Sequence, residues 1–302
     1  DQKNSLKEIN QDLKSGQKMF RLLQGDVGSG KTIVALSAAY NVIKSGFQVA
    51  IMAPTEILAR QHFNLAKKIF DKKIRIEILS SKSEYKDKKI ITKKISENYI
   101  DIIFGTHAIF QEKIIFNKLG LIIIDEQHKF GVNQRKKLSD KGGDNCDVLL
   151  MSATPIPRTL TMTVYGDMDL SIIKEKPKSR KEVITYSKLE TKIDDILRFI
   201  DKEINNGNQI FWVCPLIEES KKLNHSSAIK KYEFLSKRFP NQVALLHGKT
   251  EIEDKEKILS NFLTQKFKIL VSTTIIEVGI DFPNANVIII ENANKFGLSQ
   301  LH

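Results

Sequence analysis

The stretch Leu22-Leu23-Gln24-Gly25-Asp26-Val27-Gly28-Ser29-Gly30-Lys31-Thr32 decides the fold class of this chain. A short apolar run breaks into a glycine-rich turn that fits the pattern G-x-x-x-x-G-K-[ST], and a helix-like segment follows. Backbone N–H groups of such a loop can converge on phosphate oxygens because glycine has no Cβ to crowd them, and the positive end of the following helix faces the same anion. The stretch therefore predicts a nucleotide-binding loop between a strand and a helix.

Two side chains of this loop have predicted roles of their own. Lys31 would reach the β- and γ-phosphates of the nucleotide, and the hydroxyl of Thr32 would bind Mg²⁺. The residues expected to hold the nucleotide are Gly25, Gly28, Ser29, Gly30, Lys31 and Thr32.

Length and composition limit the class of protein to which this loop can belong. The chain has 302 residues with 41% hydrophobic content, which favours two domains with real cores. Its 48 Lys and Arg against 36 Asp and Glu give a net charge of +12, which attracts a polyanion such as nucleic acid, although scattered surface lysines would give the same number. Cys146 and Cys214 show no metal-ligand spacing. The two cysteines make no disulfide framework, which favours a reducing cytosol, and no membrane-length apolar run is present, so we expect a soluble protein.

Strand-like apolar runs alternate with amphipathic helix-like segments along the chain, which predicts an α/β fold with parallel sheets. In the first half we expect strands at 21–25, 48–53, 75–79, 101–105, 120–124 and 147–151, and helices near 3–14, 31–44, 56–70 and 84–97. From Glu182 the pattern restarts, with strands expected at 182–187, 209–214, 243–247, 268–272 and 286–291 and helices near 191–205, 226–238 and 251–264.

A polar, proline-bearing segment separates the two halves and is expected to be a linker. The predicted organisation is therefore a first domain at 1–175, a linker at 176–181 and a second domain at 182–302.

The run Leu121-Ile122-Ile123-Ile124-Asp125-Glu126-Gln127-His128 is the second chemical signal. Doubly wound sheets place ligand chemistry at the C-terminal ends of buried strands. Asp125 is expected to hold the Mg²⁺ that Thr32 contacts, and Glu126 to orient and deprotonate the attacking water. Two adjacent carboxylates could also simply begin a turn, but after a phosphate-binding loop the catalytic interpretation is favoured.

These two motifs together resemble motifs I and II of the superfamily 2 helicases, in the D-E-x-H variant. Further stretches resemble the other motifs of that superfamily, in this order: Ala53 to His62 (motif Ia), Gly105-Thr106-His107 (Ib), Ser152 to Thr159 (III), Phe211 to Pro215 (IV) and Ser272 to Asp281 (V).

The resemblance implies a motor of two tandem RecA-like P-loop NTPase lobes that hydrolyses ATP with Mg²⁺ and runs on DNA. Carried over by position, Gln2 would read adenine, while Gly279 and Asp281 would bind the nucleotide from the second lobe. The residues expected to couple nucleotide state to motif III are Gln127, His128, Ser152 and Thr154. The residues expected to touch DNA phosphates, without reading sequence, are Thr55, Thr106, Thr273 and Thr274. Other histidines, including His62 and His107, are expected to be packed or hydrogen-bonded rather than catalytic.

Within the superfamily, the motif sequences of this chain are most similar to those of the RecG family of bacterial DNA helicases. This similarity includes Asp125-Glu126-Gln127-His128-Lys129-Phe130-Gly131-Val132 and Val164-Tyr165-Gly166-Asp167-Met168-Asp169. The Mfd family of transcription-repair coupling translocases typically has a second acid where Gln127 stands. Compared with the RecG family, we expect the chain to cover most of the motor, without the N-terminal wedge domain and without motif VI, whose arginines complete the ATP site.

Two classes of function remain open at this point. The first is an ATP-dependent DNA helicase or translocase that remodels forks and recombination junctions in DNA repair, working in the bacterial cytosol without an obligate oligomer. The second is a nucleotide- and DNA-binding fragment with little hydrolysis. A preference for branched over duplex DNA depends on family analogy alone.

Overall fold

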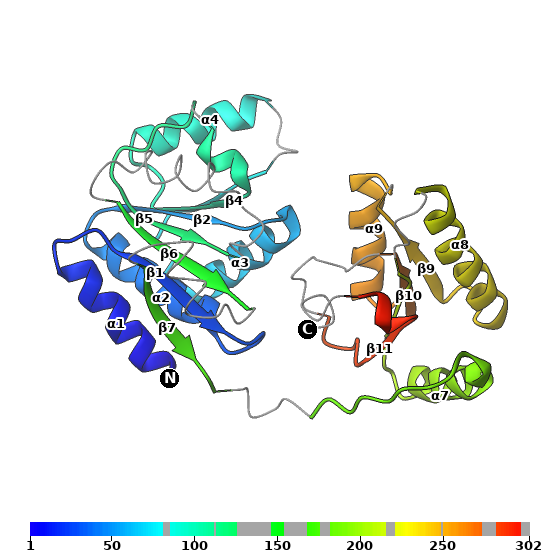
Figure 1. Cartoon of the computed structure of the whole chain (residues 1–302). Helices are drawn as coiled ribbons and strands as arrows, with labels where there is room; N and C mark the ends of the chain where they lie inside the picture. The colour runs from blue at the N-terminus through cyan, green and yellow to red at the C-terminus, as the bar shows by residue number, and fades with distance from the viewer. Residues whose placement is uncertain are drawn as a thin grey trace. The chain divides into compact units, whose positions relative to one another are not determined.

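The computed structural model describes residues 1–80, 85–111, 113–125, 146–153, 168–175, 182–215, 221–248, 250–273 and 282–296. The chain divides into two compact units, Asp1–Lys181 and Glu182–His302. Each unit is built on a parallel β-sheet with helices packed against it (Figure 1). In the described part of the chain, no helix is long and apolar enough to cross a membrane.

The first unit contains a seven-stranded sheet in the order β3-β4-β2-β5-β6-β1-β7, and every neighbouring pair in it is parallel. Its strands are β1 (Phe20–Gly25), β2 (Gln48–Met52), β3 (Ile76–Leu79), β4 (Ile102–Gly105), β5 (Leu119–Ile124), β6 (Asp147–Ser152) and β7 (Asp169–Ile173). Its helices are α1 (Gln2–Lys14), α2 (Lys31–Lys44), α3 (Glu56–Ile69) and α4 (Tyr85–Ser96), with a 3₁₀ turn η1 (His107–Phe110).

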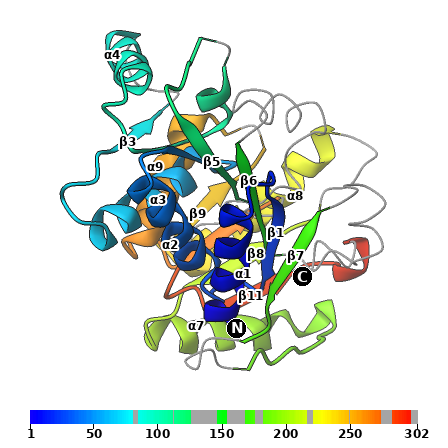
Figure 2. The same cartoon turned by 90° about the vertical axis from the view of Figure 1, so that its left-hand side faces the viewer.

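Both faces of the first sheet are buried, which explains its continuous apolar strands. Because successive strand residues point to opposite faces, Val49 and Ile51 belong to the core on the face covered by α1, α2 and α3, whereas Ala50 belongs to the core on the face of α4 and η1. Figures 1 and 2 show α1 and α2 lying next to each other along the first of these faces.

The second unit contains a four-stranded parallel sheet in the order β11-β8-β10-β9. Its elements are η3 (Glu190–Lys192), α7 (Ile193–Asn205), β8 (Ile210–Val213), α8 (Lys221–Arg238), β9 (Val243–Leu246), α9 (Ile252–Leu263), β10 (Ile269–Ser272), β11 (Val287–Ile290) and η4 (Ala293–Lys295). Trp212 on β8 is fully buried among residues of α7 and α8. On the opposite face Phe211 packs against Phe262 of α9 and against Phe282.

Two expectations for the strands are wrong. Residues 182–187 form no strand, because Val183, Ile184 and Tyr186 are all exposed and no neighbouring strand among the described residues pairs with them. Their β-branched and aromatic composition raises strand propensity without supplying a partner. The second error is the omission of β7, which pairs with β1 at the edge of the first sheet.

Candidate nucleotide-binding site

The glycine-rich loop joins β1 directly to α2, and its backbone requires glycine at two places. Gly28 has φ +78° and Gly30 has φ +92°, a left-handed conformation that L-residues adopt only at a cost. Gly30 is also the residue that caps α2, so the free N–H groups of the helix begin at the loop. The N–H of Ser29 donates to the carbonyl of Asp26 at 3.1 Å and closes the turn.

The interior of the loop fits a bound phosphate group. The Oγ of Ser29 is buried and has no hydrogen-bond partner among the described residues. A Cβ at Gly25 would lie 2.6 Å from that oxygen and 3.1 Å from the backbone oxygen of Ile173, so only glycine leaves the hydroxyl in place. A buried unsatisfied hydroxyl is costly, and an anionic ligand at this loop would give it a partner.

Lys31 points into the loop. Its side chain is buried, and its Nζ donates to the carbonyl oxygens of Gly25 at 2.7 Å and Asp26 at 3.0 Å. These bonds hold the ammonium group inside the turn that the phosphates would occupy. Thr32 follows as the second residue of α2 and is half-buried.

Gln2 contacts this loop from α1. Its side-chain Nε2 donates to the carbonyl of Ser29 at 2.8 Å, and it lies where a Cβ on Gly30 would be only 2.2 Å away. Gln2 is therefore next to the phosphate-binding loop, as its predicted part in nucleotide binding requires, while its contact with adenine stays a prediction.

Asp125 is the first residue after β5 and is 7% exposed. Its backbone N–H donates to the carbonyl of Met52 at 2.9 Å, which attaches it to the end of β2. Its Oδ2 lies 2.8 Å from Nε2 of His62 on α3. Which group donates depends on the tautomer of the ring; toward an ionised carboxylate, which only accepts hydrogen bonds, Nε2–H is the donor.

The predicted motif residues of the first unit gather at one edge of the sheet. In a parallel sheet all C-terminal strand ends lie at the same edge, and the register places Ile124 level with Met52 and Leu150. Just beyond this level, on different strands or immediately after them, are Gly25, Thr55, Thr106, Asp125 and Ser152.

The threonines expected to bind DNA differ in their surroundings. The hydroxyl of Thr55 accepts a hydrogen bond from the N–H of Leu58 at 3.3 Å and caps α3. Thr106 precedes η1 and makes no side-chain capping bond. In the second unit Thr273 follows β10 and is buried, with 4% of its surface exposed. The predicted site residues outside the described ranges are Glu126, Gln127, His128, Thr154, Thr274, Gly279 and Asp281.

The sequence did not indicate the pairing of His62 with Asp125. His62 was expected to be packed or hydrogen-bonded, and it is both, but its partner is 63 residues away in the sequence. No residue pattern marks such a pair, because it depends on where α3 lies against the end of β5.

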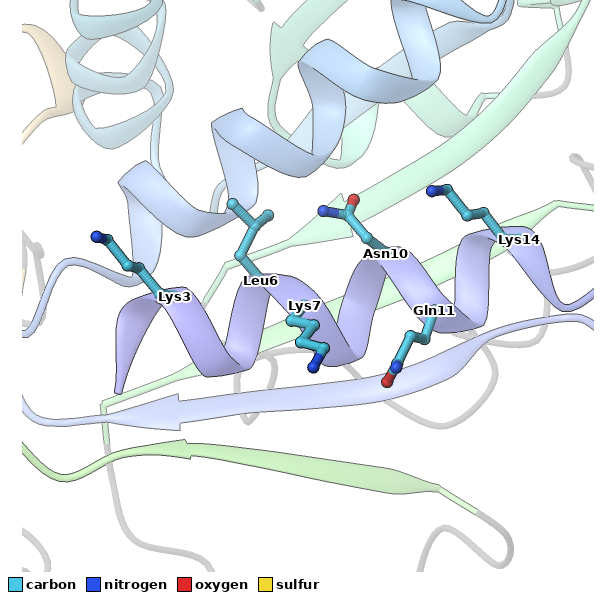
Figure 3. A pocket seen from close by; sticks show the side chains of 6 residues that line it. All are labelled: Lys3, Leu6, Lys7, Asn10, Gln11 and Lys14. Carbon is cyan, nitrogen blue, oxygen red and sulfur yellow. The ribbon is translucent and has the colours of Figure 1, made fainter.

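Other features of the molecule are not part of this site. Burial raises the pKa of the thiols of Cys146 and Cys214 to about 12 each, so neither is a reactive thiolate. A hollow of about 450 Å³ lies along α1, lined by Lys3, Leu6, Lys7, Asn10, Gln11 and Lys14 (Figure 3). All its lining residues come from that one helix, and none belongs to the motifs described above. Among the described residues no cluster of three or more His, Cys, Asp or Glu could hold a metal ion.

Comparison with known proteins identifies relatives of the whole chain. "ATP-dependent DNA helicase RecG" of Bacillus subtilis is 48% identical over 304 residues, which is 100% of this chain and 44% of the relative. The protein of the same name from Aquifex aeolicus is 49% identical and is covered to 38% of its length. The chain thus spans less than half the length of these curated relatives.

Solved structures agree with the described fold. The "Structure of RecG bound to three-way DNA junction" matches 100% of this chain and 39% of that chain, with a TM-score of 0.84 and 42% identity. Yeast Dbp5 bound to RNA and ADP BeF₃ matches 89% of this chain and 69% of that chain, with a TM-score of 0.65 and 19% identity, and supports the fold alone.

Family profiles match both units. The DEAD/DEAH box helicase profile matches residues 1–163, and the helicase conserved C-terminal domain profile matches residues 191–302. The predicted fold of two RecA-like lobes with parallel sheets is confirmed. With more than half of its length matched by the first profile, the chain belongs to the DEAD/DEAH box helicase family.

Proposed function

We propose that this chain is the motor of an ATP-dependent DNA helicase or translocase that remodels branched DNA in repair and recombination. The phosphate-binding loop and Asp125 at one sheet edge carry the ATP-dependent part of this proposal. The branched-DNA part is supported by relatives named RecG at 48–49% identity and by a RecG structure bound to a three-way junction. These names favour the RecG type over the Mfd type.

In this proposal the first unit binds the triphosphate of ATP. The backbone from Gly25 to Gly30 surrounds the phosphates, the Ser29 hydroxyl gains a partner, and Lys31 donates to the β- and γ-phosphates. An ammonium group has three N–H donors, so Lys31 can contact phosphate while keeping a bond to the loop. Thr32 and Asp125 hold Mg²⁺, which neutralises charge on the phosphates when bound.

Further residues, most of them outside the described ranges, complete the proposal. Glu126 orients the attacking water and takes its proton, because phosphoryl transfer requires an in-line nucleophile. Gln127, His128, Ser152 and Thr154 couple the nucleotide to motif III. The other nucleotide contacts are assigned to Gln2, Gly279 and Asp281.

DNA is the proposed polyanionic partner, consistent with the net charge of +12. The proposed contacts to its phosphates come from Thr55, Thr106, Thr273 and Thr274, through hydroxyl and nearby N–H groups that do not read bases. The proposed domain organisation is an ATP-binding lobe at 1–175, a linker at 176–181 and a second helicase lobe at 182–302. A DNA-processing protein of this kind would work in the bacterial cytoplasm.

Phosphate release at saturating Mg²⁺ and ATP tests the proposal directly. We expect a three-way junction to stimulate release more than linear duplex, and Glu126→Gln to bind nucleotide without turning it over. Nucleotide and DNA binding without stimulated release would favour the alternative, a binding module with little hydrolysis. Absence of nucleotide binding would contradict both.

The DNA part has a separate test. Phosphate contacts release counterions, so DNA affinity should fall steeply with salt and should not distinguish scrambled duplexes of equal shape. A flat salt response, or strong discrimination between such duplexes, would count against a motor that runs along the backbone.

A further inference from the structure

The contact between His62 and Asp125 joins two parts of the first unit that the sequence treats as separate motifs. Nε2 of His62 lies 2.8 Å from Oδ2 of Asp125, and the two side chains are 9% and 10% exposed. At this burial a hydrogen bond is only weakly exposed to competition from water. The hydrogen bond therefore fixes one oxygen of the Asp125 carboxylate, which the proposed function makes a ligand of Mg²⁺.

Both partners are anchored to the same strand end. The N–H of Asp125 donates to the carbonyl of Met52, the last residue of β2. The chain then passes through Ala53 and Pro54 to Thr55, the N-cap of α3, and His62 lies two turns into that helix. The backbone of Asp125 is thus attached to β2, while its side chain is attached to the helix that β2 leads into.

α3 itself is held firmly against the sheet. Leu58, Ala59 and Ala66 on it are buried, and His62 shares their side of the helix. A packed helix leaves the ring of His62 little freedom to move, so the direction of its N–H donor is set by the fold.

We propose that His62 is a positioning residue for Asp125, which orients the carboxylate so that it can serve as a ligand of the Mg²⁺ bound with ATP. This inference rests on the proposed function. Carboxylates that bind metals are commonly held by hydrogen bonds from neighbouring groups, and loss of such a partner typically costs about 10–100-fold in metal affinity or activity. The structure adds that the donor comes from the helix capped by Thr55, a proposed DNA contact.

Metal binding can be read separately from turnover. Mn²⁺ accepts the same oxygen ligands as Mg²⁺ and is paramagnetic, so electron paramagnetic resonance measures its affinity for the complex of the chain with a non-hydrolysable ATP analogue. Affinity for a fluorescent nucleotide in EDTA gives the part of binding that needs no metal.

The variants separate a hydrogen-bonding role from a packing role. His62→Leu fills similar space without a donor and should weaken Mn²⁺ binding by about 10–100-fold, while nucleotide affinity in EDTA stays close to the parent value. His62→Gln places an amide N–H near the original Nε2 and should retain most of the Mn²⁺ affinity. His107→Leu, at an exposed histidine of η1 in the same unit, is the matched control and should leave the affinities for Mn²⁺ and for nucleotide unchanged.

A double variant tests whether His62 acts through Asp125. Adding His62→Leu to Asp125→Asn should cost no further Mn²⁺ affinity if the histidine works only by orienting that carboxylate. If His62→Leu does not fold, His62→Asn replaces it, because its shorter amide keeps a polar group but does not reach Asp125.

Two results would overturn the inference. Parent-like Mn²⁺ affinity in folded His62→Leu or His62→Asn would show that the carboxylate needs no such donor. Equal losses in His62→Gln and His62→Leu would assign His62 a packing role. Failure of the unsubstituted chain to bind Mn²⁺ with nucleotide at all is a different outcome, since it would contradict the proposed function itself.

Discussion

Gln48 and Gln209 make the same pair of contacts in two different sheets. Nε2 of Gln48, at the start of β2, donates to the carbonyls of Ile95 and Ile100, both at 2.9 Å. Nε2 of Gln209, just before β8, donates to the carbonyls of Phe262 and Phe267 at 2.6 and 2.7 Å. In each case the two carbonyls flank the turn between a helix and the strand that pairs with the glutamine's own strand.

The turns themselves correspond in detail. Asn98 has φ +60° and Gln265 has φ +59°, each three residues after the first bonded carbonyl. Each glutamine also follows a left-handed glycine by two residues, Gly46 with φ +86° and Gly207 with φ +84°. The two units therefore share a local arrangement of helix end, glycine, glutamine and parallel strand.

Replacing either glutamine should destabilise its own unit. Gln48→Leu would remove the side-chain donor to the carbonyls of Ile95 and Ile100, at a cost of about 1–3 kcal/mol, and Gln209→Leu should behave likewise. Hydrogen exchange of each unit checks this: Gln48→Leu should expose amides of β2 and β4 while β8 and β10 keep their protection. Gln11→Leu, at an exposed position of α1, is the control. Equal loss of protection in both units would contradict the prediction that each glutamine stabilises its own unit.

Much of the fold could be predicted from the sequence because its central strands are buried on both faces. Continuous apolar runs such as Ile122-Ile123-Ile124, separated along the chain by helices, are typical of parallel strands that helices cover on both faces. The strand predicted at 182–187 was wrong because strand propensity says nothing about a pairing partner. β7 was missed because Asp169-Leu170-Ser171-Ile172-Ile173 is a mixed edge strand, in which Ser171 bonds to Arg21 of β1.

The candidate site was predictable where chemistry lies in one continuous stretch. The phosphate-binding loop can be recognised in the sequence because its spaced glycines, its lysine and its threonine all occur within a few residues. The partner of Asp125 was not predictable, since His62 reaches it only when α3, packed on β3 and β4, brings the ring to the residue that follows β5. The inward direction of Lys31 also depends on three-dimensional loop closure.

Lys31→Ala should weaken Mg-ATP binding on the order of 10–100-fold, because charge-assisted hydrogen bonds to the phosphates are lost. The change also removes the bonds from Nζ to the carbonyls of Gly25 and Asp26, so a small loss of stability should accompany it. Titration with a fluorescent nucleotide measures the first effect and thermal unfolding the second. Lys44→Ala, which removes the same charge from the last turn of α2, should leave nucleotide affinity unchanged. Similar affinities for both variants would contradict the role of Lys31.

The ion pair between Arg75 and Asp101 should give the first unit a stability that depends on pH. The Nη2 of Arg75 lies 2.5 Å from Oδ1 of Asp101, and its backbone N–H also donates to that carboxylate. Partial burial raises the pKa of Asp101, but the hydrogen bonds from Arg75 outweigh it and hold the pKa below the usual 3.8.

The sign of the pH dependence follows from that shift. Because the folded pKa of Asp101 is depressed, its stabilising effect is fully present above the unfolded pKa and is lost as the pH falls through the folded value. The difference in unfolding free energy between the parent and Asp101→Asn should thus shrink as the pH falls below about 4. Urea unfolding across the acid range measures it, with Asp71→Asn as the control for removing a nearby acidic charge. If the difference in unfolding free energy between the parent and Asp101→Asn did not change with pH, Asp101 would not be the source of the pH-dependent stability.

Gly30 and Gln2 should show strong coupling in a double-mutant cycle. A Cβ at Gly30 would stand 2.2 Å from Nε2 and 3.0 Å from Cδ of Gln2, and the φ of +92° adds backbone strain of its own. Gly30→Ala should therefore displace Gln2 from its bond to the Ser29 carbonyl and loosen the loop. The comparison is Gly16→Ala, where φ is +71° but a Cβ would meet nothing within 4 Å, so that only the strain of about 1–2 kcal/mol is felt.

The cycle separates the clash from the strain. Gln2→Ala alone should cost about 0.5–1.5 kcal/mol for its lost hydrogen bond. In Gly30→Ala combined with Gln2→Ala the clash is gone, so the double variant should be more stable than the sum of the two single losses predicts. Urea unfolding gives the free energies, and hydrogen exchange at Ser29 to Thr32 shows whether the loop closes again. Strict additivity of the two changes would mean that Gln2 does not press against the phosphate-binding loop.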